Sequence, residues 1–246
     1  MEIQDVHGIA DATLLDVWDQ ACALDRPWRE LAVLAAASGE TPARLATLSI
    51  GERDRLLLAA RARTFGRRMD CETSCASCDA RLELSLDAVE LSVSRSAIDD
   101  DDLEVEAQGM SVRFRLPDST DIAACRDAPD DPVEHLLARC VEVLTPPDGT
   151  TAVATLPQAV RDAVTERMAM LDPQAEMLLD LECPECGVRS QTSFDPAAYF
   201  LAEIDARAAC LLGEVHVLAR AYGWSEADVL ALGPARRRRY LELATQ

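Results

Sequence analysis

Hydrophobic residues recur every three or four positions through the first seventy residues, which is the period of helices that bury one side. The predicted helices are a stretch through Leu14, Leu15, Trp18 and Cys22, one from Trp28 to a stop at Gly39, a short one opened by Thr41-Pro42, and one from Gly51 to Phe65. This part of the chain is therefore expected to be helical throughout.

Strict alternation of apolar and polar residues, the period of half-buried strands, appears further along the chain. It predicts strands over 81–86, 91–94, 111–116, 177–181 and 188–194.

Helical spacing returns between and after these strands. It predicts helices over 131–144 and 157–171, joined by a turn at 146–149. A long helix is expected from Asp195-Pro196 to Gly223, and Ser225 with Asp228 forms a capping box for the next helix. Gly233-Pro234 ends that helix before a final arginine-rich stretch.

The charge balance removes several classes of function. The net charge is −20 at pH 7, which repels phosphate backbones, so we expect no nucleic-acid partner. All 24 basic residues are arginine, which excludes mechanisms that need a lysine. No apolar stretch is long enough to span a membrane, and the N-terminus lacks the layout of a signal peptide. We therefore predict a cytoplasmic protein whose nine cysteines are reduced.

Two cysteine knuckles, Cys75-Ala-Ser-Cys78 and Cys183-Pro-Glu-Cys186, carry the clearest chemistry. Each C-x-x-C turn directs two thiolates at one ion, and two such turns complete a closed tetrahedral shell, the structural form of a zinc site. We predict one structural Zn²⁺ bound by all four cysteines. Arg67, Arg68, Arg81 or Arg189 could offset the charge of the thiolates.

The spacing of the knuckles leaves alternatives open. A zinc ribbon usually separates its knuckles by about 15–20 residues, whereas 104 residues lie between Cys78 and Cys183. A subdomain must be inserted between them, unless the pairs are unrelated. Cys71 could replace Cys75 as a ligand. In both segments an Arg, a Ser and an Asp follow the second cysteine by three, seven and nine residues, which indicates a pseudo-repeat of two knuckle-plus-strand units.

These features together predict an α+β fold that is mainly helical, with a small zinc-ribbon-like β unit formed by the two distant knuckles and a helical insertion between them. The expected regions are 1–70 (N-terminal helices), 71–128 (first knuckle and strands), 129–175 (helical insertion), 176–195 (second knuckle) and 196–246 (C-terminal helices).

Four stretches resemble a known family: the segment Gly51-Glu52-Arg53-Asp54-Arg55-Leu56-Leu57, Phe65-Gly66, the two knuckles, and the C-terminal residues 214–226 with 236–243. The family is that of phage baseplate proteins related to the hub-assembly protein of T-even contractile tails, also found in extracellular contractile injection systems. The C-terminal stretch carries the most specific part of this resemblance. The first knuckle departs from the family's C-P-x-C-G pattern at Ala76 and Asp79.

The resemblance implies a structural or assembly factor without catalysis, with baseplate hub, spike or wedge proteins as partners. None of the three histidines lies in a metal or nucleophile motif, which also argues against an enzyme. The alternative is a zinc-ribbon adaptor acting in transcription or another protein complex. We expect the partner surface on the C-terminal helices, at Trp224 and the run Arg236, Arg237, Arg238 and Arg239, because four adjacent arginines cannot all face the core.

Overall fold

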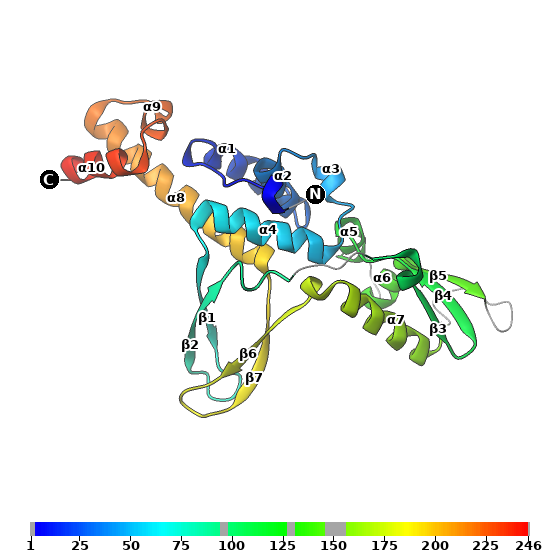
Figure 1. The fold of residues 1–246 in the computed structure, drawn as a ribbon. Helices are drawn as coiled ribbons and strands as arrows, with labels where there is room; N and C mark the ends of the chain where they lie inside the picture. The colour runs from blue at the N-terminus through cyan, green and yellow to red at the C-terminus, as the bar shows by residue number, and fades with distance from the viewer. Residues whose placement is uncertain (1–2, 94–97, 127–130, 146–155, 246) are drawn as a thin grey trace.

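A computed structural model describes residues 3–93, 98–126, 131–145 and 156–245 (Figure 1). It consists of a helical body from which a pair of β-hairpins, a small α+β module and a C-terminal helical unit project. The predicted α+β class with mainly helical content and small sheets is confirmed.

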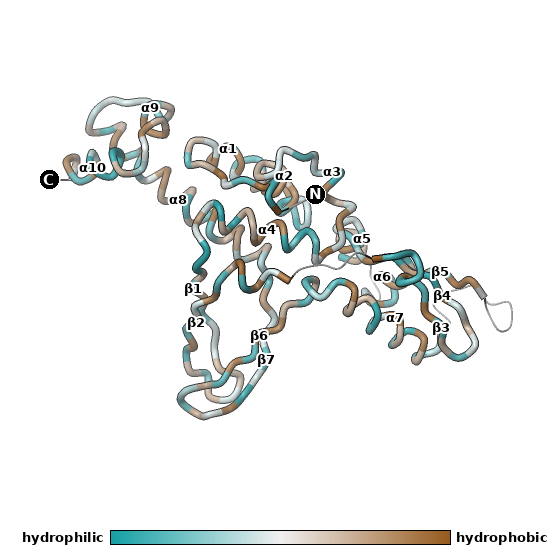
Figure 2. The backbone as a smooth tube through the Cα atoms, viewed as in Figure 1, coloured by the Kyte–Doolittle hydropathy of each residue, from teal (hydrophilic) through white to brown (hydrophobic). Residues whose placement is uncertain are grey.

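The body is built from both ends of the chain. Its elements are η1 (Ile3–Asp5), α1 (Asp11–Cys22), α2 (Trp28–Ser38), α3 (Pro42–Leu45), α4 (Ile50–Phe65) and α8 (Pro196–Tyr222). Hydrophobic and hydrophilic positions alternate along these helices, as expected where one side is buried (Figure 2). The core includes Leu31, Leu34, Leu56, Phe200 and Ile204, all at most 1 % exposed.

The helix ends follow the local signals in the sequence. Thr41 and Ser49 accept hydrogen bonds from backbone N–H groups at the starts of α3 and α4, and Asp195 does so for α8. Gly39 and Gly223 end α2 and α8 in the left-handed conformation, with φ of 72° and 70°, which glycine adopts without steric cost. The predicted N-terminal helices and the long helix 196–222 are therefore confirmed.

Two antiparallel hairpins hang below α4 and α8 (Figure 1). The first pairs β1 (Arg68–Ser74) with β2 (Arg81–Asp87), and the second pairs β6 (Met177–Glu182) with β7 (Arg189–Phe194). Each forms its own two-stranded sheet, so no backbone ladder joins them among the described residues. The predicted strands 81–86, 177–181 and 188–194 are confirmed.

The segment between the hairpins folds into a module with its own core. A three-stranded sheet in the order β3-β4-β5 shares this core with α6 and α7, and α5 packs on α6. The elements are η2 (Asp100–Leu103), β3 (Glu104–Ala107), β4 (Met110–Phe114), α5 (Ser119–Arg126), α6 (Pro132–Cys140), β5 (Val141–Thr145), α7 (Gln158–Leu171) and η4 (Pro173–Ala175).

Several expectations for this region were wrong. The helix predicted over 131–144 ends at Cys140, because residues 141–145 extend and pair with β4. The inserted segment is consequently not purely helical. In the strand predicted over 91–94, Leu91 lies in a turn, Ser92 and Val93 have no regular secondary structure, and residue 94 lies outside the described residues. The turn predicted at 146–149 lies outside the described residues.

The start of α4 sits tightly against the end of the inserted segment. The backbone N–H of Gly51 donates to Asp172 at 2.8 Å. A Cβ at position 51 would lie 2.2 Å from Oδ1 of Asp172, so only glycine permits this approach. The hydrogen bond fixes the end of the inserted module against the body.

Two short helices follow α8 at the far end of the molecule. α9 (Glu226–Leu230) begins at the predicted Ser225–Asp228 capping box, and α10 (Pro234–Ala244) packs back on α8. The break predicted at Gly233-Pro234 is confirmed.

Candidate metal centre

The four predicted cysteines lie in the turns at the tips of the two hairpins. Cys75 and Cys183 directly follow β1 and β6, and Cys78 and Cys186 lie three residues later in each turn. The two turns share one hydrogen-bond pattern. The carbonyl of the first cysteine accepts from the backbone N–H four residues on, at 2.9 Å in the first turn and 2.8 Å in the second. The pseudo-repeat in the sequence is therefore repeated in the structure.

The residue after each second cysteine adopts the left-handed conformation. Gly187 has φ of 69°, and Asp79 has φ of 59° at the equivalent place in the first turn. Aspartate is one of the few residues other than glycine that enters this region readily. The departure at Asp79 therefore leaves the knuckle geometry intact.

The four sulfurs converge although the knuckles are far apart in sequence. All four Sγ atoms lie within 4.8 Å of one another. The Sγ–Sγ distance is 3.7 Å for Cys75 with Cys186 and also for Cys78 with Cys183. A tetrahedral shell with metal–sulfur bonds of about 2.3 Å has sulfur–sulfur edges of about 3.8 Å. The cluster could hold a metal ion. Each turn would supply two of its four ligands, which form opposite edges of one tetrahedron.

The cluster is half enclosed. Cys75 and Cys183 are 4 % and 2 % exposed and pack with Leu82, while Cys78 and Cys186 are exposed. The protein thus covers one side of the centre and leaves the other open to solvent.

The thiols of this cluster cannot ionise independently. The backbone N–H of Ser77, 3.4 Å from the sulfur, lowers the pKa of Cys75 to about 6. At Cys78 the backbone N–H of Ala80 lowers the pKa, but the hydrogen bond with Cys186 and burial outweigh it and raise the pKa to about 12. Crowded thiolates repel one another, and the positive charge of a bound cation offsets this repulsion, so that all of its thiol ligands can be deprotonated.

The arginines expected to offset the thiolate charge are engaged elsewhere. Arg67 pairs with Asp87, and Arg68 pairs with Asp70. Arg81 and Arg189 likewise pair with carboxylates on their own hairpins, Glu72 and Glu83 for the first and Glu182 for the second. These ion pairs lie on the hairpins themselves, and the expected role of the arginines in offsetting thiolate charge stays a prediction.

Cys71 is not a member of the cluster. It lies four positions before Cys75 on β1, which corresponds to about 13 Å along a strand. Its side chain packs at the base of the hairpin near Tyr199, where burial raises the pKa of its thiol. The choice between Cys71 and Cys75 is therefore settled in favour of Cys75.

The base of the first hairpin is fixed by a buried arginine that the sequence did not single out. Arg61 pairs with Glu203 of α8, donates to the carbonyls of Gly66 and Arg68 at 2.6 and 2.7 Å, and lies over the ring of Tyr199. It belongs to an arginine-rich stretch that resembles a solvated face. Its partner is 142 residues away, so no local pattern marks the pair.

The C-terminal arginine run divides into different environments. Arg237 is 1 % exposed and pairs with Asp11 of α1 and, at 2.6 Å, with Glu214 of α8. It therefore cannot belong to the partner surface predicted for the whole run. Arg236, Arg238 and Arg239 are exposed.

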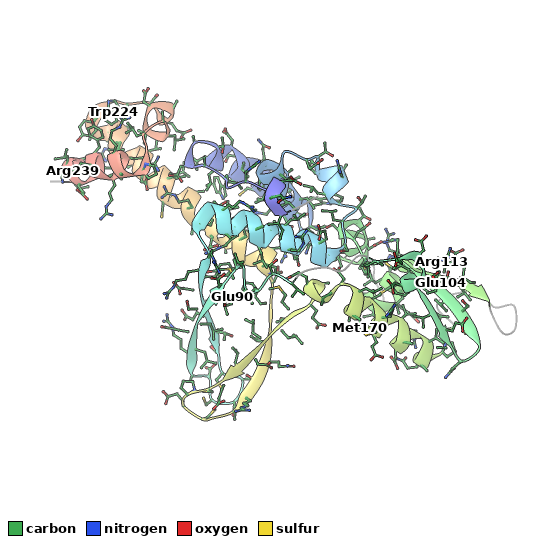
Figure 3. The ribbon with its side chains drawn as sticks, viewed as in Figure 1. Glu90, Glu104, Arg113, Met170, Trp224 and Arg239 are labelled. Carbon is green, nitrogen blue, oxygen red and sulfur yellow. The ribbon has the colours of Figure 1, made fainter. Side chains whose placement is uncertain are left out.

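Trp224 is half-buried against two tyrosines. Its ring stacks on Tyr222 at 4.7 Å and meets Tyr240 edge-on at 4.9 Å. Figure 3 places Trp224 and Arg239 at the same end of the molecule. Trp224 thus joins α8 to α10.

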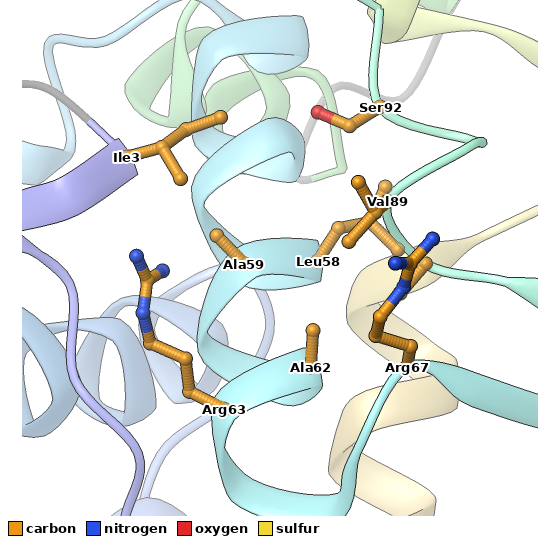
Figure 4. A pocket seen from close by; sticks show the side chains of 9 residues that line it. Ile3, Leu58, Ala59, Ala62, Arg63, Arg67, Val89 and Ser92 are labelled. Atoms are coloured by element: carbon orange, nitrogen blue, oxygen red, sulfur yellow. The ribbon is translucent and has the colours of Figure 1, made fainter.

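A separate groove of about 440 Å³ runs along α4 (Figure 4). Leu58, Ala59 and Ala62 form its floor, and Arg63 and Arg67 stand on either side of one end. Its lining includes no histidine, cysteine or carboxylate. These lining residues therefore provide no acid–base pair.

Comparison with known proteins gives one match. The model of the family described as T4 bacteriophage base plate protein matches residues 33–202, which is well over half of the chain. No curated protein and no solved structure matches it. The matched region includes α4, both knuckles and the inserted module, whereas the C-terminal stretch that carried the most specific part of the resemblance lies outside it. By this match the chain belongs to the T4 bacteriophage base plate protein family and is a phage baseplate component.

Proposed function

We propose that this protein is a non-enzymatic assembly component, chaperone-like in action, of the baseplate hub of a contractile phage tail or injection system. The family match over residues 33–202 carries the proposal. Its direct partners would be hub, spike or wedge subunits. No described helix is long and apolar enough to cross a membrane.

We further propose that the cysteine centre binds structural zinc and makes the hairpin pair a zinc-ribbon-like unit. Four cysteine thiolates in tetrahedral array are a preferred zinc donor set, and a full shell leaves no position for water or substrate. An isolated two-stranded hairpin is marginally stable. The metal would hold the two tips together, since among the described residues no backbone ladder joins the two hairpins.

The metal proposal is tested by elemental analysis of protein purified without chelators. One zinc per chain is expected in the wild type and none in Cys186→Ser, with Cys71→Ser as the control that retains it. Wild-type protein without a stoichiometric metal would refute the proposal.

The assembly role is tested by deleting the gene and complementing it with a tagged copy. Baseplates should fail to form without the protein, and hub, spike or wedge subunits should co-purify with it. Mass spectrometry of finished particles then separates the roles, because a chaperone is absent from them and a permanent subunit is present. Normal baseplates in the deletion strain would contradict both roles.

The same protein should not bind nucleic acid at physiological salt, given its net charge of −20. A salt-sensitive complex with DNA in a gel-shift assay would instead support the zinc-ribbon adaptor.

A further inference from the structure

The C-terminal unit differs in charge from the rest of the chain. Residues 215–246 contain five arginines and three carboxylates, a net charge of +2 that leaves −22 on residues 1–214. This basic region lies at the end of α8, in α9 and in α10.

One face of α10 carries the exposed part of this charge. Arg236, Arg239 and Leu243 are spaced three and four residues apart, so they lie on one side of the helix. Leu243 is 47 % exposed and adds an apolar position to this side of the helix. We call these three residues the α10 stripe.

Neither guanidinium group of the α10 stripe pairs with a carboxylate of another described element. Arg236 has no carboxylate partner among the described residues, although almost every other described arginine has one. Arg239 pairs only with Glu242 of the same helix, at 2.9 Å, and its side chain is 68 % exposed. An exposed pair of this kind adds little stability and is easily exchanged for another carboxylate.

The adjacent face of α10 is firmly held. Arg237 is buried between α1 and α8, and Tyr240 packs edge-on against Trp224. The helix therefore presents the α10 stripe in a fixed orientation, which lowers the entropy cost of docking.

We infer that the α10 stripe is a docking surface for an acidic amphipathic segment of a baseplate subunit. Carboxylates of that segment would meet Arg236 and Arg239, and an apolar side chain would cover Leu243. Complementary charge steers such an encounter and fixes its register. The inference rests on the proposed function, since it names a contact through which the protein would join the baseplate.

Two other occupants fit less well. A nucleic acid would be repelled by the −22 charge of the remaining chain. A second copy brings the same net charge of −20, so long-range repulsion opposes self-association.

The test uses the gene deletion complemented with tagged protein, with baseplate subunits identified and quantified after purification. Arg236→Gln with Arg239→Gln should reduce their recovery roughly tenfold, because two exposed ion pairs are lost. The matched control, Arg44→Gln with Arg68→Gln, removes two equally exposed charges elsewhere and should leave recovery unchanged. Thermal unfolding should be the same for both variants and the wild type.

A photo-crosslinking amino acid at position 243 identifies what covers the α10 stripe. The expected product is a crosslink to an Asp- and Glu-rich peptide of a baseplate subunit. Undiminished recovery with Arg236→Gln and Arg239→Gln, or a crosslink to a second copy or to nucleic acid, would overturn the inference. Failure of the wild type to recover any baseplate subunit would instead refute the proposed function.

Discussion

The buried guanidinium of Arg237 provides a quantitative test of how α10 is attached. Arg237 and Arg207 together bridge Asp11 and Glu214, with distances of 2.6 Å from Arg237 to Glu214 and from Arg207 to Asp11. Methionine at position 237 keeps the stem but removes the charge. We expect Arg237→Met to release α10 from α1 and α8.

The magnitude follows from burial. Removing one partner of a buried ion pair costs about 3–5 kcal/mol. The two carboxylates are 22 % and 21 % exposed and keep Arg207, so water and the remaining arginine relieve part of that cost. We therefore expect about 2–3 kcal/mol, measured as about 30- to 150-fold faster hydrogen exchange of the α10 amides.

The neighbouring residue supplies the control. Arg236→Met makes the same chemical change at an exposed position without an ion pair, so its effect should stay within about 0.5 kcal/mol. Equal exchange rates in the two variants would refute the assignment of Arg237 as the anchor of α10.

The same ion-pair network predicts that the attachment of α10 weakens at low pH. Burial raises the pKa of Asp11, but hydrogen bonds from Arg207 and Arg237 outweigh burial and lower it below its usual value. A carboxyl group whose pKa is lower in the folded than in the unfolded state stabilises the fold at pH values above its unfolded-state pKa of about 3.9. This stabilisation is lost as the pH falls through the folded-state pKa. Protection of α10 should therefore fall below about pH 4 in the wild type and change less in Asp11→Asn.

Three further outcomes are expected. Cys186→Ser should abolish metal binding and the hydrogen-exchange protection of both hairpins, while the helical signal in far-UV circular dichroism is kept. Unchanged protection of the hairpins would argue against a metal that joins their tips. Gly51→Ala should destabilise by about 1–3 kcal/mol in urea unfolding because its Cβ would clash with a carboxylate, whereas Gly213→Ala, which meets nothing within 4 Å, should stabilise α8 by about 0.5–1 kcal/mol. Burial raises the pKa of Asp54 to about 6, so wild-type stability should decline as pH rises from about 4 to 6; Asp54→Asn should remove this decline, and an identical pH profile would contradict it.

The sequence by itself determined the features that depend on neighbouring residues. Asp195-Pro196 and Gly223 mark both ends of α8, because capping and the left-handed conformation are local properties. The C-x-x-C spacing likewise identified both knuckles. Periodicity placed the body helices, since helical hydrogen bonds join residues four positions apart.

Only the tertiary structure decided the features that depend on distant partners. Residues 141–145 became a strand through pairing with β4, against a helical pattern that extended to 144. Arg237 was buried and Arg236 left exposed because Asp11 and Glu214 approach one face of α10 from other helices. The sulfurs of Cys78 and Cys183 meet across 104 intervening residues because α4 and α8 hold the bases of the two hairpins together. Helical periodicity and capping depend on residues that are close in sequence. Ion pairs, strand partners and metal ligand sets depend on which distant segments the fold brings into contact.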